Sequence, residues 1–383
     1  MHNPFASFTL DDLRGRATLK WQAYPTDVLP LWVAEMDTLL AEPVRDAVLS
    51  AVERGEVGYP WGRGYPDALA RFAAAEWGWS VDAGVMRHTT DVMTGLANLV
   101  RIVTSADGTL VITVPVYPPF LDLPAITERS HLFVPMTAAG RLDLPGLATA
   151  FAECRRLGSA PTLVLANPYN PTGTAHTRAE LEAVAGLAVE YDVRVIVDEI
   201  HAPLVYAPAA FTPYLSVPES EDAYAVHSAS KAFNLAGLKA ALIVPGPRAV
   251  DEITARLPSS VDHGASSTGV LAHTVALTEG GDWLAAHRAG LVENRALLGE
   301  WLAEMLPEVR WRRPEATYLA WLDCRQYDLG ADPAAAFLER GRVAVNSGLD
   351  FGPGGAGHVR LNFATAPNIL REALARIQAT VQR

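Results

Sequence analysis

Residues 228–239 read Ser-Ala-Ser-Lys-Ala-Phe-Asn-Leu-Ala-Gly-Leu-Lys, and two of the three lysines of the chain, Lys231 and Lys239, lie in this stretch. The third is Lys20, so arginine supplies the rest of the 31 basic residues. Arginine can replace lysine as a surface cation or phosphate partner, but its guanidinium cannot form a Schiff base, whereas a desolvated lysine amine can. Lys231 and Lys239 are therefore candidates for a covalent catalyst. The alternative is that two solvated lysines lie together by chance.

Two short motifs fit patterns of other enzymes but lack the partners that those enzymes require. Residues 228–231 fit the Ser-x-x-Lys pattern of penicillin-binding enzymes, which also need a Lys-Thr-Gly element, and no lysine here is followed by Thr-Gly. Residues 198–201 (Asp-Glu-Ile-His) look like the acidic box of a nucleic-acid helicase. That chemistry requires a Gly-x-x-x-x-Gly-Lys-Ser/Thr phosphate loop, and none of the three lysines lies in one. Both interpretations are therefore excluded.

Composition limits the class of protein. A length of 383 residues suffices for two domains, and 50% hydrophobic with 19% charged residues is typical of a globular protein. The net charge of −12 argues against a nucleic-acid surface. Cys154 and Cys324 lie far apart, which supports neither a disulfide framework nor a metal site. Residues 1–12 do not look like a signal peptide, and no apolar run reaches the ~20 residues of a membrane helix, so we expect a cytoplasmic enzyme.

Short apolar runs alternate with helical patterns along the middle of the chain. The runs are residues 110–114, 162–166, 194–197, 223–227 and 240–244. After the second run, Thr177 and Glu180 match a capping box, and the apolar residues that follow have helical spacing. Alternation of helices with nearly continuous apolar strands predicts an α/β domain with a largely parallel sheet.

Four polar or aromatic residues lie just past the ends of these predicted strands. They are Tyr117, Asn170, Asp198 and Ser228. In open α/β sheets, ligands bind beyond the carboxyl ends of the strands. We therefore expect these four side chains to converge on one crevice.

The N-terminal part lacks the alternation of strand and helix patterns that is seen in the middle of the chain. Residues 1–45 are rich in turns and aromatic side chains, which predicts an extended arm, although residues 42–55 already follow helical spacing. A glycine-rich aromatic loop at residues 58–65 contains Tyr59, a candidate site residue whose alternative role is surface packing. A helix is predicted over residues 66–77.

Thr89-Thr90-Asp91 precede an apolar pattern of helical period at residues 92–100, so they are candidate caps of a helix. The start of a helix exposes free N–H groups and the positive end of a dipole, which suit a phosphate group. The alternative is an ordinary capped helix.

The character of the chain changes near residue 285. A long helix at residues 283–305 leads to a strand at 318–322 and a further helix at 333–340, which predicts a smaller α+β domain. We therefore expect an N-terminal arm over residues 1–45, which also contributes to the small domain. A large ligand-binding domain then covers 46–284 and the small domain 285–383.

Residues 352–357 fit the Gly-x-Gly-x-x-Gly pattern of dinucleotide-binding proteins. That motif must precede a helix, whereas a strand-like stretch, residues 358–363, follows here. The pattern therefore predicts a loop before a strand that carries Arg360.

The order and spacing of four motifs resemble the aspartate-aminotransferase-like fold, fold type I of the pyridoxal-phosphate (PLP) enzymes, with class I and II aminotransferases among its members. They are Asn-Pro-x-Asn-Pro-Thr-Gly (167–173), Asp-Glu-x-His (198–201), Ser-x-Ser-Lys-Ala-Phe-Asn-x-x-Gly-Leu (228–238) and Arg-Leu-Asn-Phe (360–363). Within that fold, the stretches at 29–37, 58–61 and 231–238 look like the cystathionine β-lyase, or C–S lyase, branch.

The resemblance implies that PLP is the cofactor and assigns residues around its ring. Lys231 would hold PLP as a Schiff base and later move the substrate Cα proton. Asp198 would pair with the pyridinium nitrogen, and Asn170 would donate a hydrogen bond to the ring oxygen O3′. Tyr117 would stack on the ring. His201 takes the place that tyrosine often fills in aminotransferases.

The same resemblance assigns the phosphate and the substrate. The phosphate would be bound by the backbone N–H groups of Val92 and Met93 and by Ser228, Ser230 and Lys239. Arg360 would bind the substrate carboxylate by a bidentate fork, and Ala34 would line the substrate site. Tyr59, as a catalytic and substrate-binding residue, would reach in from the partner subunit of a homodimer.

Other roles remain open for four of these residues. Asp198 could act as a cap, His201 as a packing residue, Tyr59 as scaffold and Lys239 as a surface cation. The implied reaction is β-elimination of a thiol from a sulfur amino acid such as cystathionine, with pyruvate and ammonia as products. An aminotransferase is the first alternative, and a non-catalytic regulatory or binding protein that keeps the fold is the second.

Overall fold

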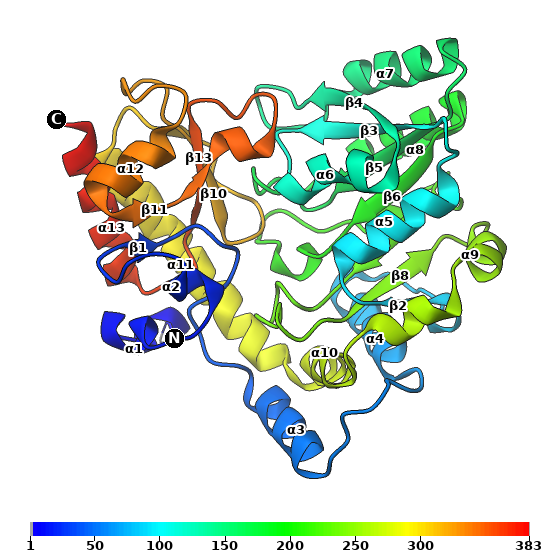
Figure 1. The fold of residues 1–383 in the computed structure, drawn as a ribbon, viewed down its shortest axis with the longest axis horizontal. Helices are drawn as coiled ribbons and strands as arrows, with labels where there is room; N and C mark the ends of the chain where they lie inside the picture. Colours follow the sequence, from blue (N-terminus) through cyan, green and yellow to red (C-terminus); the bar gives the residue numbers. More distant parts are fainter. Residues whose placement is uncertain (1–2, 383) are drawn as a thin grey trace.

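The computed structural model describes residues 3–382, and its largest element is a seven-stranded sheet of order β2-β8-β7-β6-β5-β3-β4 (Figure 1). The strands are β2 Arg87–Thr89, β3 Thr109–Val114, β4 Ser130–Pro135, β5 Pro161–Ala166, β6 Arg194–Asp198, β7 Tyr224–His227 and β8 Ala241–Pro245. Strand β8 is antiparallel to both neighbours, and the other pairings in the sheet are parallel. The predicted α/β fold with a mostly parallel sheet is confirmed.

Helices cover both faces of this sheet. They are α4 Gly64–Trp77, α5 Val92–Val103, α6 Pro118–Thr127, α7 Leu144–Arg156, α8 Arg178–Tyr191, α9 Val250–Arg256 and α10 Ser267–Glu279. Helix α5 packs against β6, β7 and β8, whereas α7 packs against β3, β4 and β5. Strands β3, β5, β7 and β8 are buried along their whole length, which explains their unbroken apolar runs.

A second, four-stranded antiparallel sheet of order β12-β13-β10-β9 lies in the C-terminal part. Its strands are β9 Arg310–Trp311, β10 Leu319–Asp323, β12 Asn346–Ser347 and β13 His358–Asn362. The helices of this part are α11 Gly281–Met305, α12 Pro333–Gly341 and α13 Pro367–Val381. This arrangement confirms the predicted α+β character. It also places the glycine-rich residues 352–357 directly before a strand, as expected.

The N-terminal segment is less extended than predicted. It contains the short helices α1 Leu10–Arg14 and α2 Leu19–Gln22, and Thr9 caps the first of them. Strand β1 Leu29–Pro30 then pairs in parallel with β11 Val343–Ala344, so this segment packs on the C-terminal part (Figure 1). Helix α3 Glu42–Glu53 packs against α10. The division of the chain at residues 45 and 284 remains a prediction.

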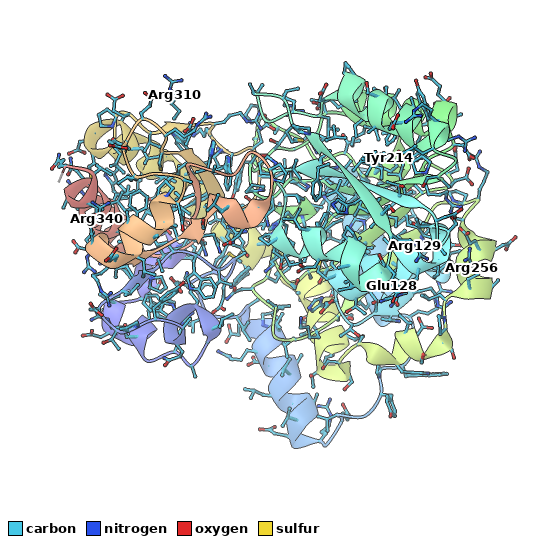
Figure 2. The ribbon with its side chains drawn as sticks, turned by 45° about the horizontal axis from the view of Figure 1, so that its top comes forward. Glu128, Arg129, Tyr214, Arg256, Arg310 and Arg340 are labelled. Atoms are coloured by element: carbon cyan, nitrogen blue, oxygen red, sulfur yellow. The ribbon has the colours of Figure 1, made fainter. Side chains whose placement is uncertain are left out.

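Several arginine side chains at the two ends of the molecule are exposed. Figure 2 shows Arg310 and Arg340 on the C-terminal part and Arg256 at the opposite end, and all three are exposed. None of the helices within residues 3–382 is both long enough and apolar enough to cross a membrane.

Leu163 and Leu157 allow a matched test of the core. Leu163 in β5 is 0% exposed, whereas Leu157 after α7 is 63% exposed. Leu163→Ala should lower the free energy of unfolding by about 2–5 kcal/mol, because it removes buried methyl groups and leaves a cavity. Leu157→Ala should change it by less than about 0.5 kcal/mol. Urea unfolding followed by circular dichroism measures both, and equal losses would contradict the assigned core.

Candidate active site

A cavity of about 290 Å³ lies at the carboxyl ends of β3, β5, β6 and β7. Its lining includes Ala34, Val92, Met93, Tyr117, Asn170, Asp198, His201, Ser228, Ser230, Lys231, Lys239 and Arg360. Parallel strands end at one edge of a sheet, which is why residues far apart in the chain meet here. Of the residues that the sequence assigned to the cofactor or substrate site, Tyr59 is the one that is absent from this lining within residues 3–382.

Lys231 supplies the amine of the cavity. Its Nζ donates a hydrogen bond of 3.0 Å to the carbonyl oxygen of Ala34. Burial lowers the pKa of Lys231 to about 8, and the Arg360 guanidinium acts in the same direction. The carboxylates of Asp198 and Glu35 act in the opposite direction. A larger fraction of this amine than of an ordinary lysine amine is therefore neutral near pH 7 and able to act as a nucleophile or base.

Asp198 ends β6 and is 7% exposed. Its Oδ1 accepts a hydrogen bond of 2.9 Å from the backbone N–H of Ile200. Burial raises the pKa of Asp198 to about 7, against the opposing effects of that hydrogen bond and of His227. A cation placed next to this carboxylate would favour its ionised form.

Arg360 reaches the cavity from β13 in the smaller sheet. It donates hydrogen bonds to Asn170 Oδ1 (3.1 Å), the Trp32 carbonyl oxygen (2.9 Å) and Asn346 Oδ1 (2.6 Å). Its Nε has no partner within the described residues, although the side chain is buried. Burial lowers the pKa of Arg360 to about 10, which leaves the guanidinium charged near neutral pH. The two sheets therefore contribute opposite walls of one site.

The start of α5 forms one end of the cavity. Asp91 is its N-cap, and Oδ1 accepts a hydrogen bond of 2.8 Å from Thr94 N. Lys239 Nζ lies 2.9 Å from the other carboxylate oxygen of Asp91. Burial raises the pKa of Asp91, but the bonds from Lys239 and Thr94 outweigh it and the pKa is lowered overall. This end of the cavity therefore has two positive features, the N-terminus of α5 and the Lys239 ammonium group.

Ser228 and Ser230 lie beside this end. Ser228 Oγ donates to the Ala240 carbonyl oxygen (2.8 Å) and accepts from the Ser230 backbone N–H (3.2 Å). This bond fixes the loop that follows β7, from which Lys231 projects. The loop is therefore held in place by Ala240, the residue directly before β8.

His201 also lines the cavity. Its side chain is buried, and its ring packs edge-on against Tyr318 with centroids 6.3 Å apart. Burial lowers the pKa of His201 to about 3, so the ring is neutral near pH 7. Its Nδ1 has no hydrogen-bond partner in the described part of the chain.

Tyr59 is not brought to the cavity of its own chain. It is 83% exposed and packs against the ring of His263, with centroids 5.8 Å apart. Trp61 beside it is 98% exposed. The loop over residues 58–63 therefore presents large aromatic side chains to its surroundings.

Several residues that shape the site were not singled out from the sequence. Asn234 binds both backbone groups of Met36, accepting from N at 2.8 Å and donating to O at 3.0 Å. Tyr318 OH donates to the Ala34 carbonyl oxygen at 3.0 Å. The sequence offered one signal for Asn234, its position inside the 228–239 stretch. In the structure its φ is 57°, a left-handed backbone conformation that asparagine adopts more readily than most residues.

The fold and the cavity define an α/β protein with a reactive amine and two carboxylates at the carboxyl edge of its sheet. The family described as aminotransferase class I and II matches residues 89–377. The chain belongs to this family.

Individual relatives cover nearly the whole chain. A Mycobacterium leprae protein is 46% identical over 98% of this chain and 97% of its own. A Corynebacterium glutamicum protein named cystathionine beta-lyase is 34% identical over 97% and 99%. A solved structure from Corynebacterium diphtheriae matches with a TM-score of 0.92 and 34% identity, covering 98% of each chain. The structure of a PLP-bound C–S lyase from Staphylococcus hominis matches with a TM-score of 0.89 and 25% identity, over 98% and 99%.

The lowered pKa of Lys231 predicts how its reactivity changes with pH. Labelling of Lys231 by an amine reagent should rise with a midpoint near pH 8, because only the neutral amine reacts. Arg360→Met should move this midpoint upward, since the guanidinium favours the neutral amine, whereas Asp198→Asn should move it downward. Peptide mass spectrometry measures the label at Lys231, with Lys239 as the internal control. Midpoints that move in the same direction would contradict the assigned charges.

Proposed function

We propose that this protein is a PLP-dependent C–S lyase that releases a thiol, pyruvate and ammonia from a sulfur amino acid. The observation that carries the proposal is the partly neutral Lys231 amine in a cavity that also holds Asp198 and Arg360. The full-length likeness to a cystathionine beta-lyase and to a C–S lyase structure supports the choice of reaction.

The residues of the cavity fit PLP. Two buried polar atoms of the lining, His201 Nδ1 and Arg360 Nε, have no partner within residues 3–382 and are free to bind a ligand. The α5 N-terminus, Ser230 and Lys239 suit a phosphate group. The fit therefore extends over both ends of the cavity, and it supports binding of a molecule with a phosphate at one end and polar ring atoms at the other.

Each lining residue has a proposed task toward this cofactor. Val92 and Met93 N–H groups, Ser228, Ser230 and Lys239 bind the phosphate. The Asp198 carboxylate holds a proton on the ring nitrogen, Asn170 donates a hydrogen bond to the ring oxygen, and Tyr117 packs on the ring face. His201 contributes a neutral ring to the lining of the cavity.

When bound, PLP supplies an aldehyde that captures the substrate amine and a ring that withdraws electrons from its Cα. Lys231 Nζ, as a neutral base, removes the proton from the substrate Cα. Arg360 binds the α-carboxylate through its unpartnered edge and thereby orients the Cα–H bond toward Lys231. Ala34 lines the substrate side of the cavity. The electron pair of the Cα–H bond then forms a Cα=Cβ double bond as the Cβ–S bond breaks, and the leaving thiolate takes a proton from the Lys231 ammonium group. Hydrolysis of the remaining unsaturated amine by water gives pyruvate and ammonia.

We further propose that the active unit is a homodimer in which Tyr59 enters the partner's cavity. One group of exposed apolar side chains lies on α3 and its flanking segments, and a partner subunit would bury it. The group consists of Leu39, Leu49, Val52, Val57, Tyr59 and Trp61. We also propose a cytoplasmic location, because the two cysteines, Cys154 and Cys324, are unpaired and buried, as in proteins of reducing compartments.

A panel of substrates tests the reaction. Cystathionine incubated with the purified protein, without any 2-oxo acid, should yield pyruvate and a thiol in equal amounts. Lys231→Ala should lower pyruvate release by at least about 100-fold and abolish the absorbance band of the imine between the cofactor and Lys231, because this amine is both anchor and base. Turnover that requires a 2-oxo acid would instead identify an aminotransferase, and cofactor binding without turnover a regulatory or binding protein.

Mixing two inactive variants tests the position of Tyr59. If Tyr59 acts in the partner's cavity, Lys231→Ala and Tyr59→Ala chains refolded together should recover about a quarter of wild-type activity, because each mixed dimer has one intact site. Each variant refolded alone is the control. No recovery, together with mixed dimers detected by native mass spectrometry, would place Tyr59 outside the partner's site.

A further inference from the structure

The segment of residues 32–37, called the strap below, lines the cavity with its first three residues, Trp32, Val33 and Ala34. Side chains from distant parts of the chain bind nearly all of its carbonyl oxygens. Arg360 binds the carbonyl of Trp32, and Asn362 binds those of Val33 (2.8 Å) and Glu35 (2.7 Å). The Glu35 N–H also donates to the Val33 carbonyl at 2.9 Å, which closes a three-residue turn around Ala34. The turn aims the Ala34 carbonyl at Lys231.

A buried ion pair holds the end of the strap. Lys20 and Asp37 are both 0% exposed, and Lys20 Nζ lies 2.7 Å from Asp37 Oδ2. The same ammonium donates to the Glu35 carbonyl at 3.2 Å. Trp21, the next residue of α2, donates from Nε1 to Asp37 Oδ1 at 2.7 Å. Two adjacent residues of one short helix thus occupy both oxygens of a single carboxylate.

This pair is not explained by stability alone. A buried ion pair is costly to desolvate, and apolar residues of similar volume often stabilise a protein equally well or better. Among the lysine and arginine ion pairs of the described residues, it is the one in which both side chains are fully buried. It also uses the one lysine outside the 228–239 stretch, in a chain that otherwise uses arginine. A compact ammonium can reach the Asp37 carboxylate and the Glu35 carbonyl together.

We propose that Lys20 is a positioning residue for Lys231: its ion pair with Asp37 fixes the strap, and the strap holds the Ala34 carbonyl as the hydrogen-bond acceptor of the reactive amine. The inference rests on the proposed function, in which Lys231 is the base. It assigns to Lys20 a role in the reaction, although Lys20 contacts neither substrate nor cofactor.

The expected change in the pKa of Lys231 follows from the hydrogen bond that its Nζ donates to the Ala34 carbonyl oxygen. A carbonyl oxygen that accepts from Nζ stabilises the ammonium form, so displacement of the strap should lower the pKa of Lys231 further. The other charged groups that act on this amine are Arg360 and Lys239, which lower the pKa, and Asp198 and Glu35, which raise it. His201 also faces the amine, but it is neutral.

The test uses charge-neutral changes, so that long-range electrostatics stay constant. The double variant Lys20→Met, Asp37→Asn removes the ion pair and keeps an acceptor for Trp21. The matched control, Arg194→Met with Glu252→Gln, removes a 2.6 Å ion pair at the other end of β6 and keeps an acceptor for Tyr224. Trp21→Phe is a milder variant that leaves the ion pair intact and frees one oxygen of Asp37.

The readout is the initial rate of PLP uptake by the cofactor-free full-length protein across a pH range, followed by absorbance. Titrations of PLP itself are common to all variants and cancel in the comparison. The midpoint should fall by about half a pH unit or more in the double variant, fall less in Trp21→Phe, and stay at the wild-type value in the control. Melting temperatures are recorded for each protein.

A double variant with the wild-type midpoint would overturn the proposal and make Lys20 a structural anchor, whatever its melting temperature. If the double variant does not fold, the test uses Trp21→Phe instead, and a wild-type midpoint in this variant would likewise overturn the proposal. A wild-type protein that takes up PLP but releases no pyruvate would refute the lyase reaction, while the midpoints still decide the role of Lys20. If PLP is not taken up at all, the same midpoints are read from amine labelling at Lys231.

Discussion

The hydrogen bond from Lys231 Nζ to the Ala34 carbonyl oxygen joins residues 197 positions apart and closes the cavity between the two sheets. On one side of this contact, strands β6 and β7 deliver Asp198 and the loop of Lys231. On the other side, β13 delivers Arg360. The amine is reactive because its burial in the cavity between the two sheets disfavours the charged form, while the strap supplies one acceptor that favours the charged form.

The balance of positive and negative charge in the cavity differs from that of the whole chain. The chain carries a net charge of −12, yet the cavity gathers Lys231, Lys239 and Arg360 against Asp91 and Asp198. These groups act on one another over short distances in a partly dry space, where electrostatic effects are stronger than at the surface. Burial is the main reason why the pKa of Lys231 falls and that of Asp198 rises toward neutral pH, and the neighbouring charges modify both shifts. A local excess of positive charge is what an anionic ligand needs in an acidic protein.

Some elements were hard to predict for identifiable reasons. Helix α6 contains Pro124 and begins at Pro118, so its local sequence disfavours a helix that tertiary packing nevertheless stabilises. Strand β4 lies at the sheet edge and is half exposed, which leaves no continuous apolar run. The N-terminal helices α1 and α2 are only 5 and 4 residues long, too short for a periodic pattern.

The amino-acid sequence by itself determined the parallel sheet, the convergence of Tyr117, Asn170, Asp198 and Ser228, and the candidate amine. These follow from local rules, because apolar runs define strands and parallel strands end at one edge. Only the tertiary structure decided that Lys20 and Asp37 form a buried pair, that Ala34 faces Lys231, and that Tyr59 stays outside its own cavity. Such contacts depend on how distant segments pack against one another, and the spacing of residues along the chain does not specify that packing.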